Sequence, residues 1–184
     1  LAERLLPHLP DQQARIFFSD NGSTAVEIGI KMARQYFYNK GVKRSKPIAF
    51  DEAFHGETFG AMAASGDHNF FRAFQDDLFE VWRIPAPVDE AKSQQALTQL
   101  EAHLKTGEVY AFLFEPLVLG AGGMLMYSPE ILDQLIGLCH QYDVLCIADE
   151  VMTGFGRTGT MFASNQLKEQ PDIMAMSKGL TGGT

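Results

Sequence analysis

The chain has 184 residues, of which 46% are hydrophobic and 21% are charged, and its formal net charge is −8. This composition suits one globular domain with a buried core, and the negative charge gives no broad attraction to nucleic acid or anionic lipid. No apolar run reaches the about 20 residues that a membrane-spanning helix needs. We therefore expect a cytoplasmic protein without a nucleic-acid or membrane partner.

Apolar segments of strand length alternate with helical patterns along the chain. A helix is expected at residues 1–9, and strands are expected at 16–18, 48–50, 81–84, 109–114, 144–148 and 173–176. Apolar residues recur at helical spacing in three segments between them, 25–37, 97–104 and 131–139. Continuous apolar strands that alternate with helices predict a three-layer α/β/α domain with a mostly parallel sheet. In such a domain ligands bind at the carboxyl ends of the strands.

The first polar motif, Asp20-Asn21-Gly22-Ser23-Thr24, stands between the expected strand at 16–18 and a helix. Thr24 and Glu27 have the spacing of a capping box. A helix start has unpaired N–H groups, and Gly22 would let an anion approach them closely, so this turn can bind phosphate. A plain helix cap explains the same residues. Taken alone, the segment leaves both interpretations open.

Two carboxylates, Asp149 and Glu150, follow the apolar strand at 144–148. Buried carboxylates need partners, because an unpaired buried charge is costly. For Glu150 there are two interpretations: it orients its neighbour, or it is a solvated residue. The glycines at 154, 156 and 159 satisfy G-x-G-x-x-G, but the acidic pair precedes them and 160–170 is a poor helix, which disfavours a dinucleotide site. A Walker B strand also ends in this way, but the chain has no G-x-x-x-x-G-K-[ST] motif.

Lys178 follows the strand expected at 173–176 and has Ser177 and Gly179 as neighbours. A lysine is most often a solvated surface residue. Small and apolar neighbours, however, would leave the amine partly desolvated and more often neutral, as a Schiff-base nucleophile requires. The lysine is therefore a candidate nucleophile at the end of a strand.

Five motifs in this order resemble those of the class III aminotransferases, which are pyridoxal 5'-phosphate (PLP) enzymes of fold type I. The motifs are Asp20-Asn21-Gly22-Ser23, Phe54-His55-Gly56-Glu57-Thr58, Glu115-Pro116 with 120–123, residues 148–159, and Ser177-Lys178-Gly179. The resemblance implies an enzyme, a transaminase, in which residues 1–184 form part of the PLP-binding large domain. An N-terminal segment and a C-terminal small domain are expected to be missing. It also implies a homodimer that binds a small-molecule amino donor and a keto acceptor.

The same resemblance implies roles for individual residues. Lys178 is the expected catalytic residue, which holds PLP and acts as base and acid in the proton transfer. Asp149 is expected to pair with the pyridinium nitrogen of the cofactor, which keeps the ring an electron sink. The cofactor phosphate is expected at the helix start at Gly22 and Ser23. Phe54, beside His55, is expected to stack on the cofactor ring. The expected cofactor-binding residues are Gly22, Ser23, Phe54, His55, Asp149 and Lys178.

Within the class, the chain is most similar to the members that act in biotin synthesis. That similarity implies amino transfer from S-adenosylmethionine to 8-amino-7-oxononanoate, which gives 7,8-diaminononanoate. Ala121 stands where many ornithine- and GABA-type relatives have Glu, whereas Phe54 and Glu57 replace the Tyr and Asp that are common in the biotin subgroup. Glu57 and Arg157 are the expected substrate-binding residues. The alternatives are another class III ω-aminotransferase, of ornithine, GABA or diamine type, and a non-catalytic truncated domain.

The histidines and cysteines do not predict a metal site. His8, His68, His103 and His140 lack metal-ligand spacing, and Cys139 and Cys146 form no C-x-x-C motif. The two cysteines are expected to be reduced thiols and not a disulfide. We therefore expect PLP as the cofactor and no metal.

Overall fold

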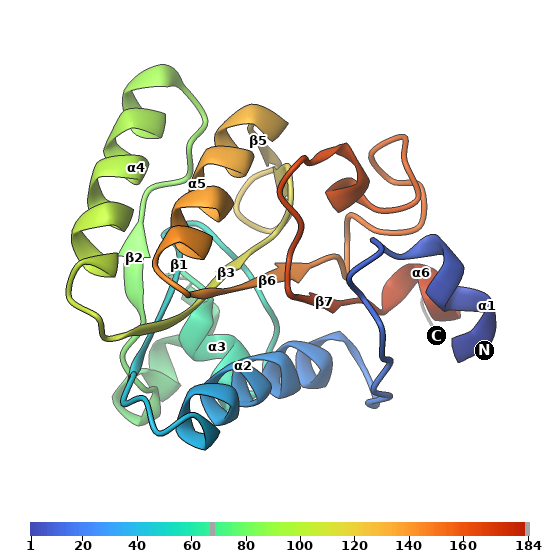
Figure 1. Ribbon diagram of the computed structural model, residues 1–184, viewed down its shortest axis with the longest axis horizontal. Helices are drawn as coiled ribbons and strands as arrows, with labels where there is room; N and C mark the ends of the chain where they lie inside the picture. The colour runs from blue at the N-terminus through green and yellow to red at the C-terminus, as the bar shows by residue number, and fades with distance from the viewer. Residues whose placement is uncertain (67–68, 183–184) are drawn as a thin grey trace.

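The computed structural model describes residues 1–66 and 69–182, and a parallel sheet between two layers of helices forms its centre (Figure 1). The strands follow the order β2-β1-β3-β6-β7, and each is parallel to its neighbours. Their bounds are β1 (Lys46–Phe50), β2 (Trp82–Ile84), β3 (Val109–Phe114), β6 (Leu145–Asp149) and β7 (Ile173–Ala175). The predicted three-layer α/β/α architecture with a mostly parallel sheet is confirmed.

The register of the strands places their carboxyl ends at one edge of the sheet. Phe114 of β3 pairs with Ala148 of β6, and Asp149 pairs with Ala175 of β7. Every residue of β3 is buried, because helices cover both of its faces. Segments that follow neighbouring strands therefore meet at a single edge, although they are far apart in the sequence.

Helices cover the two faces of the sheet separately (Figure 1). One layer contains α2 (Gly22–Asn39) and α3 (Phe59–Ala64), and the other contains α4 (Glu90–Leu104) and α5 (Pro129–Gln141). Side chains alternate between these layers along β3: Phe112 and Phe114 pack in the core under α4 and α5, and Leu113 packs in the core under α2. Each face of the sheet therefore has its own hydrophobic core.

Only part of the apolar stripe expected in the helix at 25–37 is buried. Helix α2 buries Val26, Ile30, Ala33 and Phe37 against the sheet, whereas Met32 is 40% exposed. Met32 instead lines a groove of about 560 Å³ between α2, β7 and the N-terminal segment. The sequence pattern overestimates the width of the buried face, because apolar residues that line a groove recur at the same helical spacing.

The expected strand at 16–18 does not form. This segment is coil, and Phe17 and Phe18 are 66% and 57% exposed. Side chains hold the preceding residues in place: Gln12 and Gln13 both donate to the carbonyl oxygen of Pro171, at 2.9 and 2.6 Å. Periodicity cannot separate so short an apolar run from an extended loop, which explains the wrong prediction.

Short elements connect these layers and cover the ends of the sheet. A short antiparallel hairpin of β4 and β5 follows β3, and the glycine-rich turn connects its two strands. Their bounds are α1 (Ala2–Leu5), η1 (Leu6–His8), η2 (Asn69–Asp77), β4 (Val118–Leu119), β5 (Leu125–Met126), η3 (Ala163–Gln166) and α6 (Lys178–Thr181). The helix expected at 1–9 is therefore present as α1 followed by the 3₁₀ turn η1.

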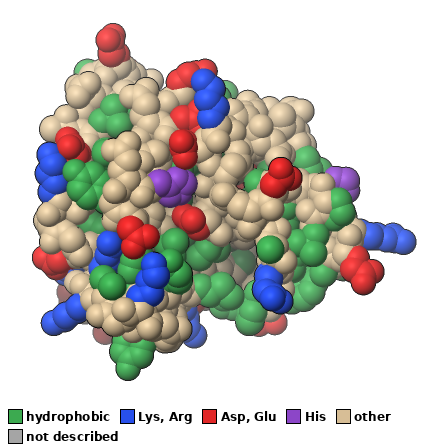
Figure 2. Space-filling view, in the orientation of Figure 1, with side chains coloured by type: hydrophobic (Ala, Val, Ile, Leu, Met, Phe, Trp, Pro, Cys, Tyr) green, Lys and Arg blue, Asp and Glu red, His purple; other side chains and the backbone are tan. Residues whose placement is uncertain are grey.

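The surface carries both signs of charge. Over the face drawn in Figure 2, acidic and basic side chains are interspersed with apolar ones. Within residues 1–66 and 69–182, no helix is long and apolar enough to cross a membrane. Both cysteines are free thiols, as the sequence predicts.

Candidate active site

The residues with predicted roles lie at the carboxyl edge of the sheet. Asp149 is the last residue of β6, and Lys178 begins α6 just after β7. The start of α2 lies between the segments that follow these two strands. A Cβ atom added at Gly22 would lie 2.8 Å from Cγ1 of Val151 and 3.4 Å from Cβ of Ser177. The fold thus brings the start of α2, the aspartate and the lysine segment to one place.

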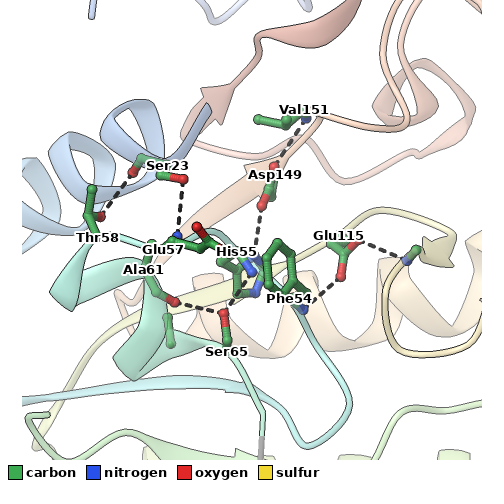
Figure 3. Close-up of polar contacts among 12 residues, drawn as sticks. Ser23, Phe54, His55, Glu57, Thr58, Ala61, Ser65, Glu115, Asp149 and Val151 are labelled. Carbon is green, nitrogen blue, oxygen red and sulfur yellow. Dashed lines mark hydrogen bonds and ion pairs between the residues drawn. The ribbon is translucent and has the colours of Figure 1, made fainter. Parts of the chain in front are cut away.

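Asp149 forms a buried pair with His55 (Figure 3). Nδ1 of His55 lies 2.8 Å from Oδ2 of Asp149, and Oδ1 of Asp149 accepts a hydrogen bond from the backbone N–H of Val151 at 3.1 Å. The backbone N–H of His55 donates to Oγ of Ser65 at 2.8 Å. An ionised Asp149 can only accept, so Nδ1 of His55 carries the proton of this bond. The histidine therefore donates to the carboxylate and orients it.

The capping of α2 differs from the sequence prediction. Asn21 is the N-cap: its Oδ1 accepts from the Thr24 N–H at 3.0 Å, and Oγ1 of Thr24 accepts from the Asn21 N–H at 3.0 Å. Glu27, the predicted partner of Thr24, instead accepts from Oγ1 of Thr58 at 2.6 Å and from the Gly60 N–H at 2.8 Å. The negative charge of Glu27 thus stabilises the N-terminus of α3, where unpaired N–H groups need acceptors.

The motif after β1 is held tightly against the start of α2. Oγ of Ser23 accepts from the backbone N–H of Glu57 at 3.1 Å. Gly56 has a φ of +125°, and a Cβ atom there would lie 2.3 Å from Oγ of Ser23. Only glycine combines that backbone conformation with such a close approach. The glycine therefore fixes His55 and its neighbours relative to α2.

Phe54 is positioned by the carboxylate of Glu115. Oε1 of Glu115 accepts from the Phe54 N–H at 3.0 Å, and Oε2 accepts from the Gly120 N–H at 2.9 Å. Burial raises the pKa of Glu115 above its ordinary value. The Phe54 ring stacks on Phe71, with centroids 5.9 Å apart and 17° between the planes. Glu115 thus links the segment after β1 to the turn between β4 and β5.

Glu150 is fully buried, so its alternative interpretation as a solvated residue is wrong. Its carboxylate accepts from Oγ1 of Thr153 at 2.6 Å, from the Ala163 N–H at 3.1 Å, and from both the N–H and Oγ of Ser164 at 2.7 Å. These donors satisfy both carboxylate oxygens. Glu150 therefore anchors the loop between β6 and η3, directly beside Asp149.

Three of the predicted site residues lie at the surface. Arg157 and Glu57 are exposed, and Lys178 is exposed where the sequence predicts partial burial. The neighbours of Lys178 do not cover it: Ser177 is small, and Gly179 has no side chain and packs closely on Phe155. The structure brings Asp149 and His55 into contact and leaves these three side chains accessible to a ligand.

Comparison with known proteins identifies the family. All of residues 1–184 match the family model of the class III aminotransferases. The chain therefore belongs to the class III aminotransferase family, whose parallel-sheet architecture agrees with the fold and with the position of the site at the carboxyl edge.

Individual relatives and solved structures show which members of the family the chain is similar to. The chain is 49% identical to adenosylmethionine-8-amino-7-oxononanoate aminotransferase of Synechococcus elongatus over 191 residues, which cover 100% of this chain and 45% of that protein. The crystal structure of the enzyme of that name from Methanocaldococcus jannaschii superposes with a TM-score of 0.92 and 37% identity, over 99% of this chain and 42% of that one. A PLP-bound amine transaminase from an uncultivated Pseudomonas species gives a TM-score of 0.88 at 32% identity, over 99% of this chain and 44% of that one. The chain thus spans less than half the length of these proteins.

Proposed function

We propose that the protein that carries this chain is a PLP-dependent aminotransferase, and that the chain contributes its large, cofactor-binding domain. One observation carries the proposal: the buried Asp149–His55 pair, 2.8 Å apart, lies at the same sheet edge as the start of α2 and Lys178. Membership of the class III family supports the reaction type.

The residues at this edge fit PLP. The first intrahelical bond of α2 starts at the N–H of Ala25, so the N–H groups of Gly22 and Ser23 have no acceptor within the helix and can bind a phosphate. The two oxygens of Asp149 offer about four lone-pair sites. One bond to each oxygen is present, so capacity remains for the N–H of a pyridinium ring. When bound, PLP supplies an aldehyde carbon and an electron-withdrawing ring.

In this proposal each residue of the chain has a separate task. Lys178 holds the cofactor through its amine and, when the amine is free, moves a proton at the substrate carbon. Asp149 keeps a proton on the ring nitrogen, and His55 orients the carboxylate through its hydrogen bond. Phe54, whose backbone Glu115 fixes, offers a face for stacking. The exposed amine of Lys178 is accessible to both cofactor and substrate.

The proposed reaction is amino transfer from S-adenosylmethionine to 8-amino-7-oxononanoate in biotin synthesis. The names of the relatives from Synechococcus and Methanocaldococcus support this choice. Arg157 and Glu57 are the proposed substrate contacts, since both are exposed in segments that follow the strands of this edge. We further propose a homodimer, and the cytoplasm as its compartment because both cysteines are free thiols.

A second candidate is amino transfer from a simple amine. The amine transaminase from Pseudomonas favours it, because its TM-score of 0.88 is close to that of the Methanocaldococcus enzyme. Phe54, which has no hydroxyl to hydrogen-bond a polar donor, is compatible with an apolar amine. The choice of amino donor distinguishes the two candidates.

An assay of the full-length protein with single donors tests the proposal. With 8-amino-7-oxononanoate as acceptor, we expect 7,8-diaminononanoate from S-adenosylmethionine and not from lysine, ornithine or an arylalkyl amine, as measured by mass spectrometry. Lys178→Ala should abolish the product, and Lys168→Ala, which changes another exposed lysine, should not. Product formed with an arylalkyl amine as donor, and not with S-adenosylmethionine, would support the second candidate. Full turnover by Lys178→Ala, or no product from any donor, would contradict the proposed function.

A further inference from the structure

A second cluster of potential ligands lies at the opposite edge of the sheet. His140 is in the last turn of α5, Cys146 is near the start of β6, and Asp172 immediately precedes β7. One ligand atom from each residue lies within 4.8 Å of the other two. Asp149 stands at the far end of β6, so this cluster is separate from the candidate active site.

The pairing of β6 with β7 sets the positions of Cys146 and Asp172. Oδ2 of Asp172 accepts from the Cys146 N–H at 2.7 Å, and the Asp172 N–H donates to the carbonyl oxygen of Cys146 at 2.9 Å. Nε2 of His140 lies 3.4 Å from the same Oδ2. The thiol is buried, which restricts its movement. The three ligand atoms are thus held close together by regular secondary structure.

Glu169 forms an outer partner of this cluster. Its Oε2 lies 3.2 Å from Nδ1 of His140, the ring nitrogen that does not face Asp172. Oδ1 of Asp133 on α5 accepts from the N–H groups of Lys168 and Glu169 at 2.8 and 3.0 Å, which fixes this loop. A carboxylate on the second ring nitrogen is the arrangement that orients metal-binding histidines in proteins.

The surroundings favour a cation that can be reached from solvent. Asp172 and Glu169 carry negative charge, and the C-terminus of α5 adds the negative end of its helix dipole. The side chains of His140 and Asp172 are 33% and 34% exposed, so an ion has access to the buried thiol between them. The ordinary interpretation is a hydrogen-bonded ion pair of His140 and Asp172 at a helix end, with the Cys146 thiol as a further hydrogen-bond partner of His140.

We propose that Nε2 of His140, Sγ of Cys146 and Oδ2 of Asp172 form a Zn²⁺ site, with Glu169 as the outer partner. Nitrogen, sulfur and carboxylate oxygen are the three donor types that zinc takes in proteins, and a water completes a tetrahedral site. Binding releases two protons to solvent, one from the Cys146 thiol and one from Nε2 of His140, which donates to Asp172 before the ion binds. The thiolate and the aspartate balance the charge of the ion. The ion ties the end of α5 to the starts of β6 and β7, the strands that lead to Asp149 and Lys178.

Cobalt substitution tests thiolate ligation directly. The holoenzyme is freed of metal with a chelator, Co²⁺ is added, and difference spectra are recorded against the metal-free holoenzyme, so that the cofactor absorbance cancels. We expect a sulfur-to-cobalt charge-transfer band and ligand-field bands of a tetrahedral ion that saturate at one Co²⁺ per chain. Competition with a chromophoric chelator then measures the affinity for Zn²⁺.

Variants assign the ligands. Cys146→Ala should remove the charge-transfer band, whereas Cys139→Ala, which changes the other buried cysteine, should retain it. Asp172→Asn keeps an oxygen acceptor for the Cys146 N–H and should weaken Zn²⁺ binding more than Glu169→Gln, for which a loss of about 10–100-fold is expected. Circular dichroism checks that each variant is folded. If Cys146→Ala is unfolded, Asp172→Asn and His140→Gln carry the assignment by their loss of Zn²⁺ affinity.

Three outcomes would overturn the proposal. The first is the absence of a charge-transfer band in the wild type, and the second is equal bands in the wild type and in folded Cys146→Ala. The third is an affinity for Zn²⁺ that Asp172→Asn and His140→Gln leave unchanged. Each would show that His140, Cys146 and Asp172 do not form the proposed zinc site.

Discussion

At the scale of single residues, the candidate active site depends on how buried polar groups are satisfied. Asp149 and His55 are 4% and 3% exposed, and their side chains form a hydrogen bond with each other. A lone aspartate in this position would be strongly disfavoured. These hydrogen bonds set the orientation of the Asp149 carboxylate toward a ligand that brings a ring N–H.

Asp149→Asn tests the need for the negative charge. Asn has nearly the same size but removes the charge, so we expect kcat/KM to fall about 100-fold, equivalent to about 3 kcal/mol of transition-state stabilisation. Steady-state kinetics of the full-length protein give this value, with the exposed Asp11→Asn as the control. An unchanged kcat/KM would exclude Asp149 from the reaction.

Glu115 makes stability depend on pH. Burial raises its pKa in the folded chain, so between its ordinary and its raised value the folded state holds a proton that the unfolded state has lost. Stability should therefore decrease as pH rises through this window. Glu115→Gln is neutral at every pH and should flatten the decrease, as urea unfolding between about pH 4.5 and pH 8 can measure. An identical pH profile for both proteins would contradict this assignment.

At this scale the sequence predicts which residues stand at strand ends, but it does not predict which distant residues meet. The positions of Asp149 and Lys178 at strand ends follow from the apolar runs that precede them. The contact with His55 does not follow, because no spacing rule relates residue 55 to residue 149. The cluster of His140, Cys146 and Asp172 escapes prediction for the same reason, since its members come from three elements.

At the scale of elements, helix termini and loops are fixed by carboxylates from other segments. Glu27 of α2 accepts at the N-terminus of α3 from Oγ1 of Thr58 and from the N–H groups of Gly60 and Ala61. Glu150 holds the loop after β6 in a similar way. The sequence pattern pairs Glu27 with Thr24 instead, because capping rules consider only neighbours along the chain. Tertiary contacts decide which donors a carboxylate finds.

Glu27→Ala should destabilise the chain through α3. The substitution leaves the first N–H groups of α3 without their acceptor, and we expect a loss of about 1–2 kcal/mol in the free energy of unfolding. The control is Glu101→Ala, which removes an exposed pair with Lys105 and should change stability by less than about 0.5 kcal/mol. Urea denaturation compares the two variants. Equal effects would show that Glu27 is not a helix cap.

At the scale of the whole molecule, the two edges of one parallel sheet have different tasks. The carboxyl edge gathers the start of α2, Asp149 and Lys178, and the amino edge gathers the proposed zinc ligands. The layers and the choice of the carboxyl edge follow from the alternation of apolar strands and helices. The segment 16–18, which is wrongly predicted as a strand, lies outside the sheet, whose strand order ends at β7. Its place outside the sheet is a property of the assembled fold and not of its own sequence.

Identification of the lysine that binds PLP is the most direct test of the central claim. The full-length protein is reduced with borohydride, which makes the bond between PLP and a lysine permanent, and its peptides are mapped by mass spectrometry. We predict a single pyridoxyl-phosphate group on Lys178 in the wild type, and none in Lys178→Ala. A label on a different lysine, or an unlabelled wild-type protein, would contradict the account.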